Sequence, residues 1–425
     1  MDDLAQDLAD FITAAPSPYH AVAEAARRLA AAGFVEQPEA GPWTDRAGGR
    51  YLVRDGTILA WFRPESNRPG TPLRVFAAHP DSPTLKVKPR PDVGAAGWQQ
   101  VAVEVYGGAL WNSWLDRDLG LAGRLALYDG STVLVDVHRP LLRVPQLAIH
   151  LDRGVNAEGL HLDAQHHLLP IWGLGAPVAG GLLDFLAAEA DVDPAEVAAH
   201  DLVVHDVTPP ARLGRDQELL AAPRLDNLSS VHAGIGALLA AAERTAGPEP
   251  AATIPVFVGF DHEEIGSGTA TGAAGPLLEN LLTALAGGFD ARAAAFAGSR
   301  CLSVDVTHAA HPNYLGHHEP GHRSVPGGGP TLKVNANQRY ATDAPGAAAW
   351  HRACREADVP TQIFVAKNTI PCGSTVGPIL ATRLGIRTVD VGIPVLSMHS
   401  ARELCGVRDP GYLATAATEF LTDPR

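Results

Sequence analysis

Apolar residues in the stretch 2–33 recur at the spacing of an amphipathic α-helix. Val22, Ala25 and Leu29 lie three or four positions apart, which places them on one face of a helix. A Pro-Ser-Pro run at 16–18 interrupts the pattern, because proline lacks the N–H group that a helix interior needs. We therefore expect a helical region with a break at this run.

Short apolar runs after this region predict β-strands, and one of them, 73–78, leads directly into His79. From about residue 92 the chain becomes strand-rich, with Gly and Pro between the apolar segments. This texture predicts an inserted, mostly β domain at 92–217. The strands expected up to this point are 50–54, 57–62, 73–78, 101–106, 121–128, 131–137 and 202–207, and a helix is expected at 178–189.

Beyond residue 217 the pattern alternates between helices and strands. Such alternation indicates a mixed, largely parallel sheet with helices on both faces. We therefore expect residues 1–91 and 218–425 to form one discontinuous α/β domain. The Gly-, His- and Pro-rich stretch 316–330 is expected to be a long loop and a candidate active-site lid. The helices expected here are 229–244, 277–285, 377–384 and 410–422, and the strands are 254–260, 301–306, 362–366 and 387–391.

The length, charge and composition of the chain argue against several classes of function. At 425 residues the chain is long enough for two domains, and its net charge of -14 argues against binding to nucleic acid or to an anionic membrane. No apolar run reaches the roughly 18 residues of a membrane span, and the acidic N-terminus lacks the features of a signal peptide. The four cysteines show no CxxC spacing. We therefore expect a cytoplasmic protein with reduced cysteines.

Candidate metal ligands follow several of the predicted strands or begin a helix. Because the carboxyl ends of parallel strands meet at one edge of a sheet, residues that are remote in sequence can converge there. Imidazole and carboxylate suit zinc, with manganese and cobalt as alternatives. Two ions held close together need a shared carboxylate, for which we favour Asp226. The predicted ligands are His79, Asp226, Glu264, Asp305 and His399.

Two further acidic residues adjoin these ligands. Glu263 precedes the ligand Glu264, and neighbouring side chains diverge, so Glu263 is free to accept the proton of a water molecule. Asp81 is placed to orient His79 through its second ring N–H. Taken singly, each residue has a simpler explanation: Asp226 as a helix N-cap, Glu263 as part of a charged helix start. Only their combination favours a two-metal hydrolase.

Other catalytic patterns are weaker. The His262-Glu263 pair lacks the second His of H-E-x-x-H, which excludes the one-zinc protease helix. Ser374 does not occupy the centre of a G-x-S-x-G elbow, and Cys372 has no evident His partner.

The motifs together resemble the M18 metallopeptidases, the aspartyl aminopeptidase family, over nearly the whole chain. The matching stretches are 79–83 (HPDSP), 106–124 (YGGALWNSWLDRDLGLAGR), 147–153 (LAIHLDR), 224–229 (RLDNLS), 260–267 (FDHEEIGS), 332–342 (LKVNANQRYAT), 370–380 (IPCGSTVGPIL) and 398–403 (MHSARE).

The resemblance implies two Zn²⁺ ions per subunit, with Glu263 as the catalytic base and Asp81 orienting His79. It implies that the inserted β domain mediates dimerisation, that dimers assemble into a homododecamer, and that His150 reaches the active site of a neighbouring subunit. Lys333 and Tyr340 fall at substrate-binding positions, where Lys333 would meet the acidic side chain of an N-terminal Asp or Glu.

Several alternatives remain open. The chain could be an aminopeptidase of the same family that prefers neutral residues, or another two-metal hydrolase such as a deacylase or a phosphoesterase. It could also be a non-catalytic peptide-binding cage in which the metals are structural.

Overall fold

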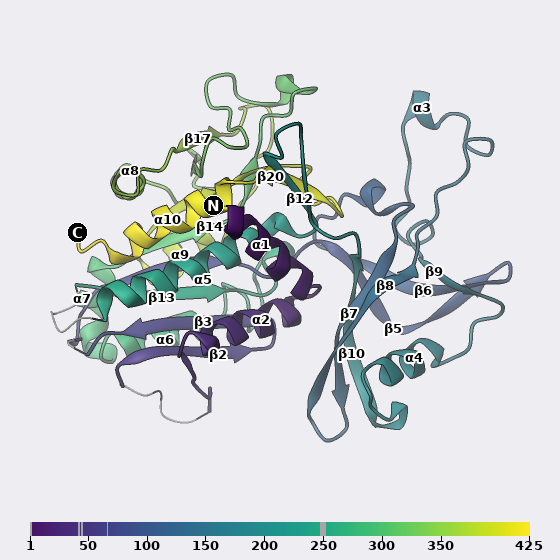
Figure 1. Ribbon diagram of the computed structural model, residues 1–425, viewed down its shortest axis with the longest axis horizontal. Helices are drawn as coiled ribbons and strands as arrows, with labels where there is room; N and C mark the ends of the chain where they lie inside the picture. Colours follow the sequence, from purple (N-terminus) through teal and green to yellow (C-terminus); the bar gives the residue numbers. More distant parts are fainter. Residues whose placement is uncertain (1, 41–42, 44–45, 66, 247–251) are drawn as a thin grey trace.

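The computed structural model describes residues 2–40, 43, 46–65, 67–246 and 252–425. Figure 1 shows a larger α/β body, which contains both termini, beside a smaller body dominated by strands. The described residues form three sheets of nine, six and five strands. Among these residues, no helix is both long and apolar enough to cross a bilayer.

The nine-stranded sheet is the frame of the larger body. Its central strands β13, β4, β14 and β18 run parallel, so their carboxyl ends lie at one edge. All residues of β4 and β13 are buried, as expected for strands covered on both faces. In spatial order the strands are β1 (Val35–Glu36), β2 (Gly48–Arg54), β3 (Thr57–Arg63), β13 (Ile254–Gly259), β4 (Leu73–Ala78), β14 (Arg300–Val304), β18 (Arg387–Gly392), β16 (Thr331–Val334) and β17 (Gln362–Val365).

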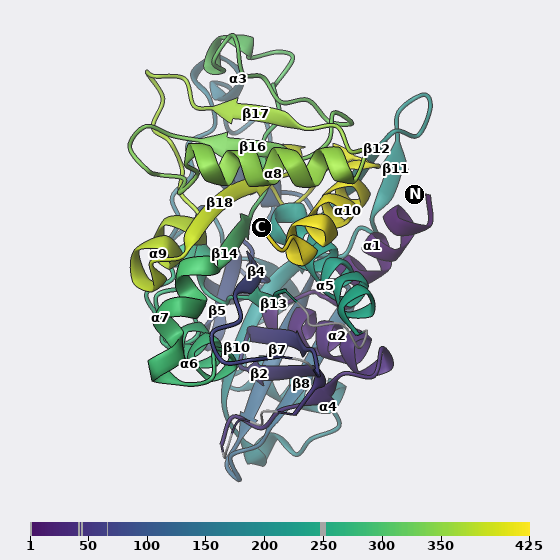
Figure 2. The same cartoon turned by 90° about the vertical axis from the view of Figure 1, so that its left-hand side faces the viewer.

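Helices cover both faces of this sheet, as Figure 2 shows. Alternate residues of β4 point to opposite faces, so Phe76 joins one apolar core and Val75 the other. The mixed, helix-flanked sheet predicted from the sequence is confirmed. The core that contains Phe76 includes residues of α1 (Asp2–Ala14), α2 (Pro18–Ala31), α5 (Leu225–Thr245), α8 (Ala344–Glu356) and α10 (Asp409–Thr422). The core that contains Val75 includes residues of α6 (Leu277–Leu285), α7 (Phe289–Gly298) and α9 (Val376–Leu384).

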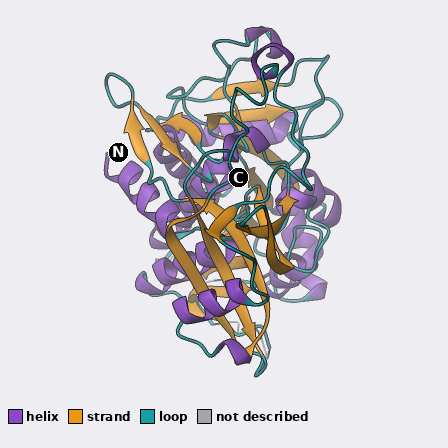
Figure 3. Cartoon of the chain, turned by 90° about the vertical axis from the view of Figure 1, so that its right-hand side faces the viewer, coloured by secondary structure: helices purple, strands orange, loops and turns teal. Residues whose placement is uncertain are grey.

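The six-stranded sheet forms the smaller body and has its own apolar core, against which α4 (Gly181–Glu189) packs. Figure 3 shows this body from the side of its strands. The predicted boundary at residue 92 falls inside β5, a strand that the sequence analysis did not identify. In spatial order the strands are β8 (Thr132–Leu142), β7 (Leu119–Leu127), β10 (Val197–Asp206), β5 (Thr84–Ala95), β6 (Trp98–Tyr106) and β9 (Ile171–Leu174).

A third, five-stranded sheet supports residues on both sides of the site. Strand β12 leads into α5, and β19 leads into the segment that carries His399. In the stretch 316–330 the described structure has one 3-10 turn, Leu315–His317, and otherwise no helix or strand, as expected. The short helix α3 (Val155–Glu158) lies on an arm of the smaller body, the segment 143–170 between β8 and β9. In spatial order the strands of the third sheet are β11 (Ala211–Leu213), β12 (Leu219–Ala222), β20 (Glu403–Gly406), β19 (Pro394–Leu396) and β15 (Thr307–His308).

Candidate active site

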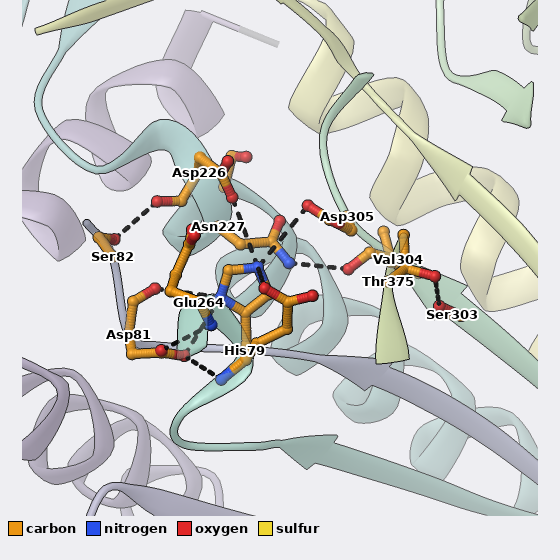
Figure 4. A network of polar contacts seen from close by, with 12 residues as sticks. His79, Asp81, Ser82, Asp226, Asn227, Glu264, Ser303, Val304, Asp305 and Thr375 are labelled. Atoms are coloured by element: carbon orange, nitrogen blue, oxygen red, sulfur yellow. Dashed lines mark hydrogen bonds and ion pairs between the residues drawn. The ribbon is translucent and has the colours of Figure 1, made fainter. Parts of the chain in front are cut away.

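The predicted ligands converge at the carboxyl edge of the central strands. His79 follows β4, Asp305 follows β14, and Glu264 lies in a 3-10 turn after β13. These three strands are immediate neighbours, with β4 in the middle. Asp226, at the start of α5, and His399, beyond β19, complete the cluster, of which Figure 4 shows His79, Asp226, Glu264 and Asp305.

Asp226 lies between the two imidazoles. Its Oδ1 is 3.4 Å from His79 Nε2, and its Oδ2 is 3.3 Å from His399 Nε2. On one side, Asp305 Oδ1 lies 3.6 Å from His79 Nε2. On the other, Glu264 Oε2 lies 3.5 Å from His399 Nε2. Two groups of potential ligands therefore share Asp226.

The donor chemistry fits a divalent cation. Ligands that bind zinc at about 2.0–2.2 Å in tetrahedral geometry lie roughly 3.3 Å apart, close to the separations observed here. Asp226 Oδ1 is buried and has no hydrogen-bond partner in the described structure, which leaves a lone pair for a metal. Although burial opposes protonation of His399, Asp226 and Glu264 raise its pKa to about 10. The same negative field attracts a cation.

The start of α5 is shaped to present Asp226. Asp226 and Asn227 have non-helical backbone angles, and the peptide bond between them is cis. Ser82 Oγ donates to the carbonyl oxygen of Asp226 at 2.6 Å, and Asn227 Nδ2 donates to that of Val304 at 2.8 Å. The segment is thereby tied to the residues that leave β4 and to β14 (Figure 4).

Asp81 contacts both sides of the site. The Nδ1 atom of His79 lies 3.0 Å from the Asp81 carbonyl oxygen and 3.3 Å from its Oδ1. The two carboxylate oxygens also accept the backbone N–H groups of Glu263 and Glu264, at 3.2 and 3.1 Å. Tyr106 Oη donates a further bond of 2.8 Å. Asp81 therefore positions the turn at 263–265 in addition to His79.

Glu263 lies at the mouth of the cluster. Its Oε2 is 3.9 Å from His79 Nε2, and its side chain is 16% exposed, so water can reach it. Burial raises its pKa to about 7; His79 opposes the increase, and the charges of Asp305 and Asp81 add to it. A carboxyl group with a pKa near neutrality can both accept and return a proton at pH 7.

Sequence reasoning missed Glu403, a buried acid of β20. Its Oε2 accepts the backbone N–H of Asp226 at 2.8 Å, and its Oε1 accepts that of His399 at 2.7 Å. Burial and the charge of Asp226 raise its pKa to about 8, and the two backbone N–H groups oppose this increase. The signal was its place in the matched stretch 398–403.

Two glycines at 107 and 108 bring the smaller body close to the ligands. A Cβ atom at Gly108 would lie 3.1 Å from His399 Nδ1, and one at Gly107 would lie 3.0 Å from Glu264 Cβ. Gly108 also offers its carbonyl oxygen to His399 Nδ1 at 3.0 Å. The glycines thus allow the backbone to support His399 without displacing it.

A cavity of about 320 Å³ opens beside the ligands and contains the predicted substrate-binding residues. Lys333, on β16, is 2% exposed, with its Nζ 3.7 Å from Asp305 Oδ2 and 5.3 Å from the ring centroid of Tyr340. His150 is exposed on the arm of the second body and does not line this cavity. The cavity residues include Glu263, all five predicted ligands, Lys333 and Tyr340.

Comparisons with known proteins agree with this geometry. Residues 11–421 match the model of a family described as aminopeptidase I zinc metalloprotease (M18). The chain is 58% identical over 420 residues to a probable M18 family aminopeptidase 2 of Streptomyces avermitilis, covering 98% of this chain and 96% of that protein.

Solved structures share the whole fold. A chain of the Ape4 and Nbr1 complex, determined by cryo-EM, is 34% identical with a TM-score of 0.93, covering 99% of this chain and 85% of that one. The S. cerevisiae mApe1 dodecamer is 30% identical with a TM-score of 0.85, covering 99% and 96%. The chain therefore belongs to the M18 family of zinc metallo-aminopeptidases.

Proposed function

We propose that this protein is a dizinc aminopeptidase that removes N-terminal Asp or Glu from peptides. The observation that carries the proposal is the placement of Glu263 beside two ligand groups that share Asp226. His79 and Asp305 would hold one ion, Glu264 and His399 the other, and Asp226 would bridge them. Zinc bound there would polarise the scissile carbonyl and lower the pKa of water toward neutrality.

Side chains of this protein transfer the protons and hold the residues of the site in place. Glu263 accepts a proton from the attacking water and returns it to the leaving amine. Asp81 holds His79 and the turn at 263–265 in position through the contacts described above. Nearby carboxylates attract the free amine of the substrate, which favours exopeptidase action.

Lys333 is the proposed determinant of acidic specificity. Its ammonium group is nearly fully buried, where a charge-assisted bond to a substrate carboxylate is stronger than in water. Tyr340 packs beside it. Because the closest carboxylate to Lys333 is Asp305, a metal ion on Asp305 would weaken that pair and release Lys333 for substrate.

The same contact supports a second candidate specificity. If Lys333 stays paired with Asp305 when metal is bound, the pocket is electrically balanced and an N-terminal neutral residue fits better than an acidic one. This alternative keeps the reaction and changes only the substrate preference.

Assembly is a separate part of the proposal. We propose that residues 92–217 form a dimerisation domain, that the protein assembles into a dodecamer, and that His150 serves a neighbouring active site. The exposed apolar residues Leu147, Ile149 and Leu151 flank His150 on the arm, as expected for a buried contact in an assembly. The relative mApe1 of S. cerevisiae forms a dodecamer.

Initial rates on Asp-, Glu- and Leu-anilide substrates test the specificity. Lys333→Met removes the charge while nearly keeping the length of the side chain. The control is Lys88→Met, a half-buried lysine of the smaller body whose Nζ contacts Gln165 and does not line the cavity. We expect kcat/KM for Asp over Leu to fall about tenfold or more in Lys333→Met, as for the loss of a charge-assisted bond. An unchanged Asp/Leu ratio would remove the assignment.

A further inference from the structure

A second group of potential metal ligands lies in the smaller body and shares no residue with the groups of the active site. It consists of Asp136 and His138 on β8 and His205 on β10. One ligand atom from each lies within 4.8 Å of the others. Figure 1 shows β8, β7 and β10 side by side in the smaller body, with β7 between the other two.

The geometry resembles three positions of a four-coordinate metal site. Asp136 offers one oxygen to each imidazole: Oδ1 lies 3.3 Å from His205 Nε2, and Oδ2 lies 3.6 Å from His138 Nδ1. The centroids of the two imidazole rings are 5.2 Å apart. Separations near 3.3 Å are those of ligands around one tetrahedral zinc ion.

The backbone is adapted to bring His205 across the intervening strand. His205 pairs with Gly120 on β7, and a Cβ atom at Gly120 would lie only 2.7 Å from His205 Nε2. The pairing of β7 with β8 also shifts register between Leu119 and Leu121. A glycine and an irregular ladder thus allow an imidazole of β10 to reach the carboxylate of β8.

The burial of the His205 side chain is energetically unfavourable. It is 1% exposed, and both ring nitrogens, including the Nε2 atom that faces Asp136, are buried without a hydrogen-bond partner among the described residues. An imidazole nitrogen without a hydrogen bond can offer its lone pair to a metal ion, and such an ion would satisfy the buried Nε2 atom.

Access from solvent is also present. The side chains of Asp136 and His138 are 27% and 34% exposed, so an ion could enter without unfolding the sheet. His20 of α2 and Arg224 are the other titratable groups that interact with the cluster, and burial lowers the pKa of His20 to about 4. Arg224 carries a positive charge, and the charges of Asp206, Asp136 and Glu403 offset it.

We propose that Asp136, His138 and His205 bind a divalent transition-metal ion, zinc foremost, which links β8 to β10 across β7. Two nitrogens and one oxygen form a donor set that suits zinc, and three protein ligands leave a coordination position for water. The ion would tie the edge strand β8 to the interior of its sheet. This site does not depend on the identity of the peptide substrate.

Zinc content per chain tests the proposal. Wild type, His138→Ala and Asp136→Asn are equilibrated in a buffer of fixed, low free zinc, and His161→Ala, an exposed histidine of the arm, is the control. We expect both cluster variants to hold about one zinc ion fewer per chain than wild type and the control, with peptide hydrolysis unchanged. Equal zinc content in all four proteins would overturn the proposal.

A variant that misfolds would also lose zinc, so a second measurement uses the wild-type protein. Crystals of the wild-type protein grown with zinc are measured at the zinc absorption edge. Anomalous density among Asp136, His138 and His205 is the expected result. Density confined to the active site would overturn the assignment.

Discussion

Glu403 provides a sharp test of how the metal ligands are positioned. Its two oxygens accept the backbone N–H groups of Asp226 and His399, so one side chain fixes a ligand of each group. In Glu403→Gln one oxygen becomes an NH₂ group, which cannot accept a hydrogen bond. One of the two N–H donors then loses its partner, without a change in side-chain volume.

The expected magnitude follows from the cost of that lost bond. A buried donor without a partner costs about 1–3 kcal/mol. A cost of about 1.4–2.8 kcal/mol corresponds to a loss of about 10- to 100-fold in an equilibrium constant. The same range, about 10- to 100-fold, is typical when a partner that orients a metal ligand is removed. We therefore expect zinc affinity to fall by this factor.

Competition with a chromogenic chelator measures the affinity. Glu419→Gln is the control, because Glu419 pairs with Arg244 at 2.7 Å, and Arg244 lies in the last turn of α5, at the end opposite Asp226. Glu403→Ala should lose more zinc affinity than Glu403→Gln, since it leaves both N–H donors without a partner. Wild-type affinity in Glu403→Gln would refute the positioning role.

Two further predictions concern stability. In Gly234→Ala the new Cβ atom would lie 2.6 Å from the rings of Phe76 and Phe257, so the free energy of unfolding should fall by about 1–3 kcal/mol in urea titrations. Gly236→Ala, on the same helix with nothing within 4 Å, should raise it by about 0.5–1 kcal/mol, and equal effects of the two would contradict the packing of α5. Hydrogen bonds from His232 and Arg28 hold the pKa of Asp7 below its ordinary value of 3.8, although burial opposes them. The stabilisation is present above pH 3.8 and is lost as the pH falls, so melting temperature should fall less steeply with acid in Asp7→Asn than in wild type; parallel curves would exclude the contribution.

The convergence of the predicted ligands could be expected from the sequence because several of their positions depend on a local pattern. The apolar run at 73–78 favours a buried strand, and His79 follows it directly. The runs before Glu264 and Asp305 have the same character. Once three such strands are parallel neighbours, the meeting of their carboxyl ends follows from topology.

Other parts of the fold lack such a local pattern. Strand β5 contains Pro89 and Pro91 among alternating charges, and its pairing with β6 shifts register between Val87 and Asp92. A strand with interrupted pairing does not show the regular alternation of apolar and polar residues by which a strand is predicted from sequence. The role of Glu403 was equally hidden, because its partner Asp226 is 177 residues away in the sequence.

Helix α8 was missed although a signal was present. Ala349, Trp350 and Ala353 are buried at helical spacing, and Asp343 caps the helix by accepting the N–H of Gly346 at 2.7 Å. The alanine-rich composition weakens the contrast between the two faces of the helix, which obscures its period.

In the proposed reaction, Glu263 carries the proton at the site formed by the five predicted ligands. The most direct test of this role is kcat of Glu263→Gln, measured together with the zinc content of the same sample. We predict a decrease of about 10²- to 10⁴-fold at unchanged zinc content. Turnover close to that of the wild type, at full zinc content, would show that Glu263 does not carry the proton.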